Sequence, residues 1–339
     1  MVAASSLGYA LAAVVTKHLP GLLVMFTLLV PAEAQAEDYY ALVITGASGN
    51  PTYASTYTRW RQDLVDVLRT QPGFSDDHLI VLGDTPGPGV GTASKDGVVD
   101  AFARLRQTMT TESVLLVLLM GHGTYDGVDA KFNLVGPDLG VEAWDRLLDG
   151  LPGRAVFVNT TASSFPFVAT LARPGRVVIT ATASSVQRYD TVFPSYFVRA
   201  FASPEADADK DGRVSVWEAF SASSEQVRQW YQREGRLATE RALLDDSGDG
   251  VGADAQEPGG DGHLAARIFV GAGVGESSPE TDPALAPLVA EREALQEQVA
   301  ALKAQKGSIS SSTYRQELER LLIDLARVSR DLRHAVQEL

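Results

Sequence analysis

Short hydrophobic runs alternate with helix-spaced hydrophobic residues between positions 39 and 182. The runs have the composition of strands that are covered on both faces. They lie at 40–45, 78–82, 113–120, 154–158 and 176–180. Between the first two runs, Trp60, Leu64, Val67 and Leu68 recur at the spacing of one helix face. This alternation predicts an α/β fold with a mostly parallel sheet and helices on both faces. In such a sheet the loops after the strands share one edge, where ligands bind.

Two loops on this edge carry side chains that can take part in chemistry. The run at 113–120 leads directly into Gly121-His122-Gly123, and the run at 154–158 leads into small polar residues at 159–164. Glycines on both sides of a histidine allow the backbone to approach a ligand and leave the imidazole uncovered. We therefore interpret His122 as a candidate functional residue rather than a structural hydrogen-bonding one.

A histidine between glycines after one buried strand, with a small polar cluster after the next, resembles the caspase and legumain-like peptidases. The resemblance implies a caspase-haemoglobinase fold over residues 37–203. In that family the histidine is a general base or acid, and a cysteine at the second strand end is the nucleophile. His122 and Gly123 would then stand at the ancestral active site. The nucleophile position falls at Thr161 when counted from the strand end, or at Ala162 when counted back from Ser164, and Ser163 is a further hydroxyl there.

The chain contains no cysteine, which excludes disulfides, thiolate metal sites and a thiol nucleophile. A thiolate beside an imidazolium is a strong nucleophile at neutral pH, whereas a Thr or Ser hydroxyl needs a stronger base. Phe165-Pro166 also crowds the turn where the family has a glycine. We therefore expect a catalytically degenerate homologue, a pseudoenzyme that acts as a binding or scaffolding module. The alternative is an active hydrolase that uses His122 with a Thr or Ser nucleophile at 161–164.

Residues 207–218 match the twelve-residue EF-hand loop, which predicts a Ca²⁺ site. Gly212 occupies the sixth position, where the loop must turn sharply, and Val214 is the apolar eighth residue. The predicted ligands are the side chains at positions one, three, five, nine and twelve and the carbonyl at position seven. These residues are Asp207, Asp209, Asp211, Arg213, Ser215 and Glu218. The alternative is an acidic, solvated turn.

A second acidic stretch begins like a partner loop at Asp245, Ser247 and Asp249. Its twelfth position is Gln256, so the closing bidentate carboxylate is missing. Asp254, Glu257 or Asp261 could replace that carboxylate, and the alternative is a Gly- and Asp-rich loop that binds no metal. We expect residues 204–275 to form a calcium-binding helical segment that completes the domain, with the ion in a structural role. A calcium-responsive structural protein is a third hypothesis for the whole chain.

Residues 282–339 are predicted to form a helical hairpin of coiled-coil type. Leucines repeat every seven residues in each half, with other aliphatic residues between them. The repeating positions are Leu288, Leu295, Val299, Leu302, Leu318, Leu321, Leu325, Val328 and Leu332. Each arm is short for an isolated coiled coil, so the arms should pair with each other or with a partner chain. We therefore expect a protein partner or self-association through this hairpin.

Residues 1–36 have the features of a secretory signal peptide. An apolar stretch at 22–30 follows Lys17 and His18, and Ala34-Gln35-Ala36 is a small-x-small cleavage site. The stretch is shorter than the roughly 20 residues of a membrane span, so we expect no span after cleavage and a secreted or periplasmic protein of the cell envelope. The net charge of −14, without a Lys/Arg cluster, argues against nucleic acid.

Overall fold

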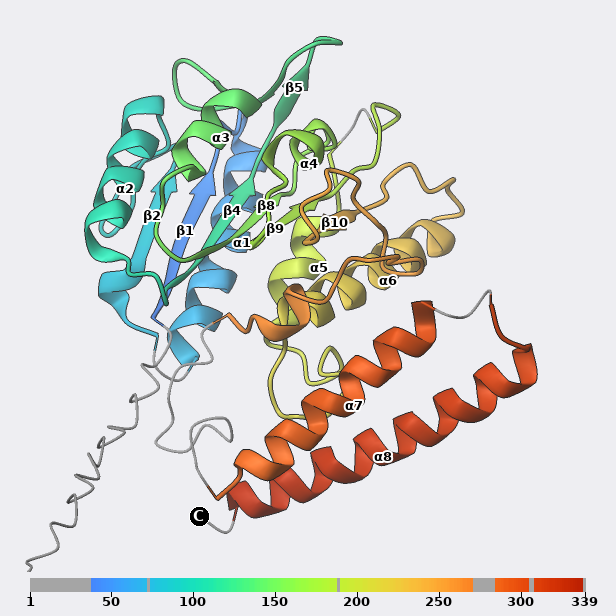
Figure 1. The fold of residues 1–339 in the computed structure, drawn as a ribbon. Coiled ribbons are helices and arrows are strands. Elements are labelled where there is room, and N and C mark those ends of the chain that lie inside the picture. The colour runs from blue at the N-terminus through green and yellow to red at the C-terminus, as the bar shows by residue number, and fades with distance from the viewer. Residues whose placement is uncertain (1–37, 72–73, 188–189, 271–283, 305–307, 338–339) are drawn as a thin grey trace, which may run out of the picture. The chain divides into compact units, whose positions relative to one another are not determined.

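The computed structural model describes residues 38–71, 74–187, 190–270, 284–304 and 308–337, so the predicted signal peptide lies outside them. Its centre is a seven-stranded sheet in the order β10-β9-β8-β4-β1-β2-β3 (Figure 1). All neighbouring strands are parallel except β10, which runs antiparallel to β9. The strands are β1 (Tyr39–Thr45), β2 (Leu79–Gly83), β3 (Gly91–Thr92), β4 (Val114–Met120), β8 (Arg154–Asn159), β9 (Arg176–Thr180) and β10 (Leu243–Asp245).

Two hydrophobic layers cover the two faces of this sheet, as the alternating side chains of β1 show. Tyr39, Ala41 and Val43 pack toward one layer, and Leu42 and Ile44 toward the other. The first layer contains α1 (Pro51–Thr70), α5 (Phe193–Ala200) and α6 (Val216–Arg233). The second contains α2 (Lys95–Thr108), α3 (Val141–Leu148) and α4 (Pro166–Leu171). The predicted α/β fold, with a mostly parallel sheet between helices, is therefore confirmed.

Pairing register brings the carboxyl ends of four neighbouring strands level with one another. Thr45 pairs with Met120, Leu119 pairs with Asn159, and Asn159 pairs with Thr180. The loops after β1, β4, β8 and β9 consequently open at the same edge. This edge contains the histidine loop and the small polar cluster that the sequence singled out.

Several short elements were not predicted. A second sheet, ordered β5-β6-β7, consists of β5 (Gly123–Tyr125), β6 (Ala130–Phe132) and β7 (Leu139–Gly140). Two 3₁₀ turns lie at η1 (Asp76–His78) and η2 (Ala265–Arg267). The segment 204–275 is only partly helical, because its β10 extends the main sheet beside β9. It therefore contributes both α6 and an edge strand to the α/β domain.

The described part of the C-terminal segment forms two helices, α7 (Ala286–Ala304) and α8 (Ser311–Gln337), which pack on each other. Their contact is made by the predicted heptad residues, with Leu295, Val299, Leu321 and Val328 buried at its centre. Supercoiling of the pair stays a prediction. Among the described helices, including these two long ones, none combines the length and hydropathy that crossing a bilayer requires.

Candidate functional site

His122 follows β4 directly and stands at the carboxyl edge of the sheet, with its side chain 31% exposed. Its two ring nitrogens have different partners. Nε2 lies 3.1 Å from the hydroxyl of Tyr57 on α1, and Nδ1 lies 3.3 Å from Oδ1 of Asp190, in the loop between β9 and α5. We call these three residues, together with Tyr53, the histidine site. It is built from segments that follow three different strands.

The chemistry of the partners fixes the hydrogen-bond directions around the imidazole. A carboxylate beside a neutral imidazole favours the ring proton on the nitrogen that faces it, so we place that proton on Nδ1, which lies 3.3 Å from Oδ1 of Asp190. In the neutral ring Nε2 then accepts, and the hydroxyl of Tyr57 donates to it. Burial, with added repulsion from the charge of Asp190, raises the pKa of Tyr57 and keeps its phenol protonated. The nitrogen that would act as a general base is therefore already occupied by a proton donor.

Asp190 also holds Tyr53, which completes the histidine site. The hydroxyl of Tyr53 donates to Oδ2 of Asp190, and this hydrogen bond raises the pKa of the phenol. The ring of Tyr53 meets the imidazole of His122 edge-on, with 4.6 Å between the ring centroids. Tyr53 and Tyr57 are four residues apart on α1, so both project from one helix face toward the histidine. Each oxygen of Asp190 thus has one partner in the site.

Thr161, the first candidate for the nucleophile position, is 1% exposed. Its backbone N–H donates to Oδ1 of Asn159, and its hydroxyl oxygen has no hydrogen-bond partner among the described residues. The hydroxyl points toward Gly123, where a Cβ would come within 2.5 Å of it. A buried hydroxyl that contacts neither solvent nor the imidazole cannot reach a substrate carbonyl.

Ala162 and Ser163, the other candidates, are half-buried. The carbonyl of Ala162 accepts a hydrogen bond from the hydroxyl of Thr182, 3.1 Å away. The hydroxyl of Ser163 donates to the carbonyl of Gly123 at 3.1 Å. The structure thus brings Ser163 and Thr161 beside Gly123, while the nitrogens of His122 contact Tyr57 and Asp190 instead. Of the predicted residues, Ser163 has the most accessible hydroxyl.

The glycines around His122 have a local structural reason. Gly121 has φ of +150°, and a Cβ there would come within 3.2 Å of the backbone nitrogen of Gly46. Gly123 must leave room for Thr161 and for the carbonyl of Lys131. Close approach between loops of this chain therefore explains both glycines, and a ligand is not needed to account for them.

Sequence reasoning missed Tyr53, Tyr57 and Asp190. A helix that follows the first strand begins at the carboxyl edge, so its first two turns border the site. Tyrosines at the third and seventh positions of α1 were therefore a usable signal. Asp190 had no such signal, because its loop has neither a motif nor a periodic pattern.

The predicted calcium ligands do come together. Carboxylate oxygens of Asp207, Asp209 and Asp211 lie within 4.8 Å of one another in the turn that precedes α6. We call residues 207–218 the acidic loop. Asp207 accepts hydrogen bonds from the N–H groups of Asp211 and Gly212, at 3.1 and 3.0 Å. Lys210 and Gly212 have positive φ values of 63° and 91°, which turn the chain sharply at this point.

Glu218, the twelfth residue of the acidic loop, closes it from the first turn of α6. Its Oε1 accepts from the N–H groups of Ala208 and Asp209, and its Oε2 from the N–H and hydroxyl of Ser215. Ser215 in turn caps α6 through the N–H of Glu218, so the pair forms a capping box. The predicted side-chain ligands at positions one, three, five, nine and twelve are therefore drawn into one compact turn.

Two cations balance part of the charge of the acidic loop. Oδ2 of Asp211 lies 3.0 Å from a guanidinium nitrogen of Arg292 on α7 and 3.4 Å from one of Arg213. The pKa of Asp209 is nevertheless raised to about 7, first by burial and then by the neighbouring charges of Asp211 and Glu218. A divalent cation would relieve that repulsion.

The second acidic loop shares several backbone contacts with the first. Asp245, at the end of β10, accepts from the N–H groups of Gly248 and Gly250. Asp261 accepts from Asp246 and Ser247, the loop positions that Glu218 serves in the acidic loop. Burial raises the pKa of Asp245 and of Asp261. Of the three replacements that the sequence offered for the missing carboxylate, Asp261 is the one that makes these contacts. Asp254 instead pairs with Arg241.

Comparison with known proteins gives a coarse likeness of fold. No protein family model matches the chain, and no curated protein does. One similar solved structure is a Geobacter sulfurreducens protein, 12% identical, with a TM-score of 0.40, covering 61% of this chain and 92% of that one. Another is the Drosophila initiator caspase Dronc, 13% identical, with a TM-score of 0.42, covering 66% of this chain and 84% of that one. At this level the likeness concerns overall fold and says nothing of activity.

Proposed function

We propose that this chain is an exported, catalytically degenerate homologue of the caspase and legumain-like peptidases that works as a calcium-stabilised binding or scaffolding module. The observation that carries the proposal is the state of the two catalytic positions. Nε2 of His122 is occupied by Tyr57, and the hydroxyl of Thr161 is buried away from the imidazole. General-base catalysis requires the base within hydrogen-bond reach of the nucleophile's proton.

The absent cysteine supports the same proposal. A thiolate beside an imidazolium carries the family's chemistry, and no thiol exists anywhere in this chain. A hydroxyl would need the imidazole as a strong base. The protonated phenol of Tyr57, whose pKa is raised, occupies the imidazole nitrogen that would have to accept the proton of that hydroxyl. The site therefore keeps an ordered imidazole and lacks an activated nucleophile.

Calcium is proposed as the resident ion of the acidic loop. The residues fit the ion: the oxygen ligands that Ca²⁺ prefers gather there, and burial together with the neighbouring charges of Asp211 and Glu218 raises the pKa of Asp209 to about 7. The ion would neutralise this charge and fix the start of α6. Since α6 packs against the sheet, the bound ion would stabilise this part of the domain. The second acidic loop is a weaker candidate for the same ion.

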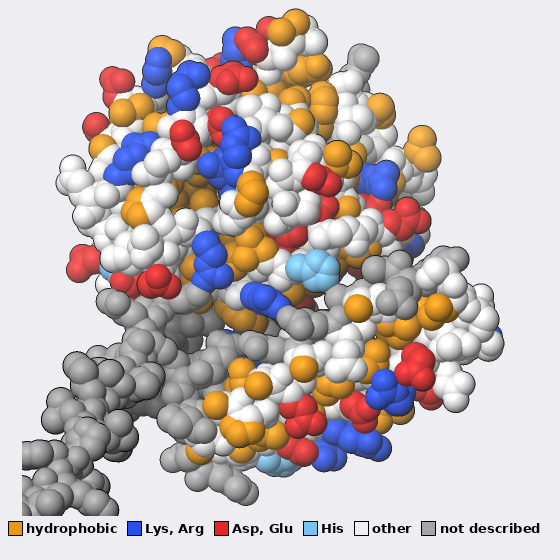
Figure 2. Space-filling model, viewed as in Figure 1, with side chains coloured by type: hydrophobic (Ala, Val, Ile, Leu, Met, Phe, Trp, Pro, Cys, Tyr) orange, Lys and Arg blue, Asp and Glu red, His pale blue; other side chains and the backbone are white. Residues whose placement is uncertain are grey.

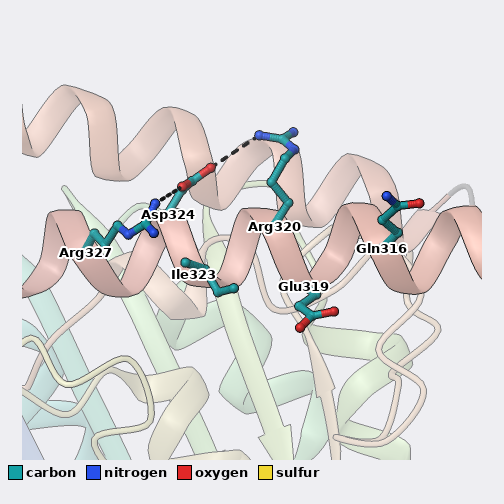
Figure 3. A pocket seen from close by; sticks show the side chains of 6 residues that line it. All are labelled: Gln316, Glu319, Arg320, Ile323, Asp324 and Arg327. Atoms are coloured by element: carbon teal, nitrogen blue, oxygen red, sulfur yellow. Dashed lines mark hydrogen bonds and ion pairs between the residues drawn. The ribbon is translucent and has the colours of Figure 1, made fainter.

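The C-terminal hairpin supports the binding role. On α8, Ile323 is 45% and Leu322 47% exposed, beside a row of ion pairs. Figure 3 shows Asp324 between Arg320 and Arg327, with 3.3 and 3.2 Å separating the charged atoms. An exposed aliphatic patch beside charges of both signs suits a protein partner or a second copy of the hairpin. Basic and acidic side chains are also interspersed over the face drawn in Figure 2, which suits a protein partner better than nucleic acid.

An active hydrolase that uses Ser163 is the second candidate function. The specific observation in its favour is the half-buried hydroxyl of Ser163 on the carbonyl of Gly123, the residue after His122. Catalysis would require Tyr57 to leave Nε2 and Ser163 to reach it. The two candidates differ in whether the protein turns over peptides at all.

A peptide-library assay separates these candidates. Under the proposal, wild-type protein and His122→Ala release product at the same background rate, with and without calcium. Turnover by the wild type that His122→Ala and Ser163→Ala both abolish would establish the hydrolase instead. Thr161→Cys and Ala162→Cys test which residue stands at the family's nucleophile position. The cysteine nearer the imidazole should be alkylated at mildly acidic pH, because a neighbouring imidazolium lowers the pKa of a thiol. His122→Ala should remove that reactivity.

A further inference from the structure

One basic side chain links the C-terminal hairpin to the acidic loop. Arg292 of α7 is 5% exposed, and its Nη1 lies 3.0 Å from Oδ2 of Asp211. The side chain of Asp211 is only 3% exposed, so the ion pair is buried from both sides. One turn further along α7, Nε2 of Gln296 lies 3.4 Å from Oδ2 of Asp209. The hairpin thus contacts two of the predicted calcium ligands.

The two oxygens of Asp211 have different roles. Oδ1 accepts the backbone N–H of Arg213 at 2.9 Å and so maintains the turn of the acidic loop. Oδ2 has side-chain cations as partners, Arg292 at 3.0 Å and Arg213 at 3.4 Å. Oδ2 is therefore the oxygen that offers its lone pairs to a cation. Arg292 approaches the position that a metal ion bound to this carboxylate would take.

Calcium and Arg292 cannot both be accommodated well at that oxygen. A calcium ion lies about 2.4 Å from each ligand oxygen, so an ion on Oδ2 would be in contact with the guanidinium. Both groups are positive, and both are buried, where repulsion between like charges is strong. Calcium would also draw the carboxylates of Asp209 and Asp211 inward and away from Gln296 and Arg292. Each cation therefore weakens the binding of the other.

We propose that the acidic loop is the docking site of the α7–α8 hairpin, with Arg292 as its key contact, and that calcium competes with Arg292 and releases the hairpin. This inference rests on the proposed calcium site. The free hairpin would keep its helix–helix core, which is formed by its own leucines. It would expose the face of α7 that carries Arg292 and Gln296, and so become available to a partner. By linkage, hairpin docking lowers calcium affinity by the same factor by which calcium weakens docking.

The first measurement is the distance between the hairpin and the sheet domain. Because the full chain has no cysteine, spin labels at Asp100→Cys on α2 and Gln298→Cys on α7 are unique. Without metal we expect one narrow distance distribution, and with saturating calcium a broad one. In Arg292→Gln the distribution should be broad in both conditions. A wild-type distribution that stays narrow in saturating calcium would overturn the inference.

The second measurement is calcium affinity by titration calorimetry on the same full chain. Arg292→Gln should bind calcium roughly tenfold more tightly, the scale of coupling expected between two sites that compete. Arg292→Lys keeps the charge and should stay near the wild type. Arg327→Gln removes an equivalent charge from the exposed face of α8 and should change neither the spin-label distance distribution nor the calcium affinity.

The outcomes separate this inference from the proposed calcium site. If wild type binds calcium and Arg292→Gln binds it equally or less tightly, the competition is wrong and the calcium site stands. If neither the wild type nor Arg292→Gln binds calcium, the calcium site itself is wrong, and the inference fails with it.

Discussion

The hydroxyl of Tyr57 lies 3.1 Å from Nε2 of His122, and Asp190 lies on the opposite side of the ring. The imidazole is therefore held between a phenol and a carboxylate. A carboxylate on Nδ1 orients a histidine for general-base work and stabilises its protonated form. A phenol on Nε2 has the opposite consequence, because it occupies the lone pair that a nucleophile's proton would need. The histidine site thus holds the imidazole by its Nδ1 side and occupies its Nε2.

Removing the hydroxyl of Tyr57 should free this nitrogen. Tyr57→Phe keeps the buried ring and removes the donor to Nε2. A hydrogen bond worth about 1 kcal/mol corresponds to roughly a fivefold change in the fraction of unbonded nitrogen. We therefore expect diethyl pyrocarbonate to modify His122 roughly five times faster in the variant, measured by peptide mass spectrometry.

Tyr53→Phe is the matched control for that experiment. It removes a hydroxyl that binds Asp190 and leaves the bond between Tyr57 and His122 in place. His122 should react at nearly the wild-type rate in this variant. Equal acceleration in both variants would mean that general loosening of α1, and not the hydrogen bond to Nε2, controls reactivity.

Two adjacent threonines should respond in opposite ways to the loss of a hydroxyl. The hydroxyl of Thr160 donates to the carbonyl of Leu119 at 2.7 Å, whereas that of Thr161 is buried without a partner among the described residues. Replacing an unsatisfied buried hydroxyl with a methyl removes a desolvation cost, while breaking a buried hydrogen bond adds one.

Thr161→Val should raise the free energy of unfolding by about 1 kcal/mol, and Thr160→Val should lower it by about the same amount. Urea denaturation followed by circular dichroism measures both. Destabilisation by Thr161→Val would show that its hydroxyl has a partner, such as a buried water, and would reopen the role of Thr161 in the site.

The main sheet could be predicted because its central strands are buried on both faces. All seven residues of β4 are buried, so the strand is visible in the amino-acid sequence as a continuous apolar run. β10 and the strands β5, β6 and β7 contain two or three residues each, too few for a period to show. Their pairing depends on tertiary contacts, which local sequence does not encode.

The site was only partly predictable for a related reason. His122 and the acidic loop have local signatures, glycines in one case and a twelve-residue pattern in the other. Tyr57 has the spacing of a core residue on a helix, and its signal is its place in the first two turns of α1, which border the carboxyl edge of the sheet. Asp190 and Arg292 reach their partners from distant segments. A contact between segments far apart in sequence leaves no periodic trace in a single chain.

Glu218→Gln should weaken calcium binding at least about tenfold, because it removes one charge from a bidentate ligand. The amide can still accept hydrogen bonds from Ser215, so the start of α6 should fold. Titration calorimetry and the calcium-induced rise in melting temperature measure the effect. Glu225→Gln makes the same change at an exposed position of α6 and should bind calcium like the wild type. Identical calcium shifts in Glu218→Gln and the wild type would refute the assignment of Glu218 as a ligand.

Glu240 should make the protein less stable as the pH rises from about 5 to 8, because burial raises its pKa from 4.5 to about 7. It is 4% exposed, and its carboxylate accepts the N–H groups of Val192 and Phe193 at the start of α5. A raised folded-state pKa means that the stabilising contribution is complete below pH 4.5 and is lost as the pH rises through 7. Glu240→Gln is neutral throughout, so the wild type should lose up to about 3 kcal/mol relative to it across this window.

Urea denaturation at pH 5 and pH 8 in EDTA measures the difference and holds the metal state constant. In Glu225→Gln, which removes a carboxylate whose pKa Arg228 lowers, the difference from the wild type should stay nearly constant from pH 5 to pH 8, because the contribution of that carboxylate is lost only as the pH falls below its unfolded value of 4.5. If the stability difference between the wild type and Glu240→Gln is flat from pH 5 to pH 8, Glu240 titrates normally and its burial is relieved by solvent.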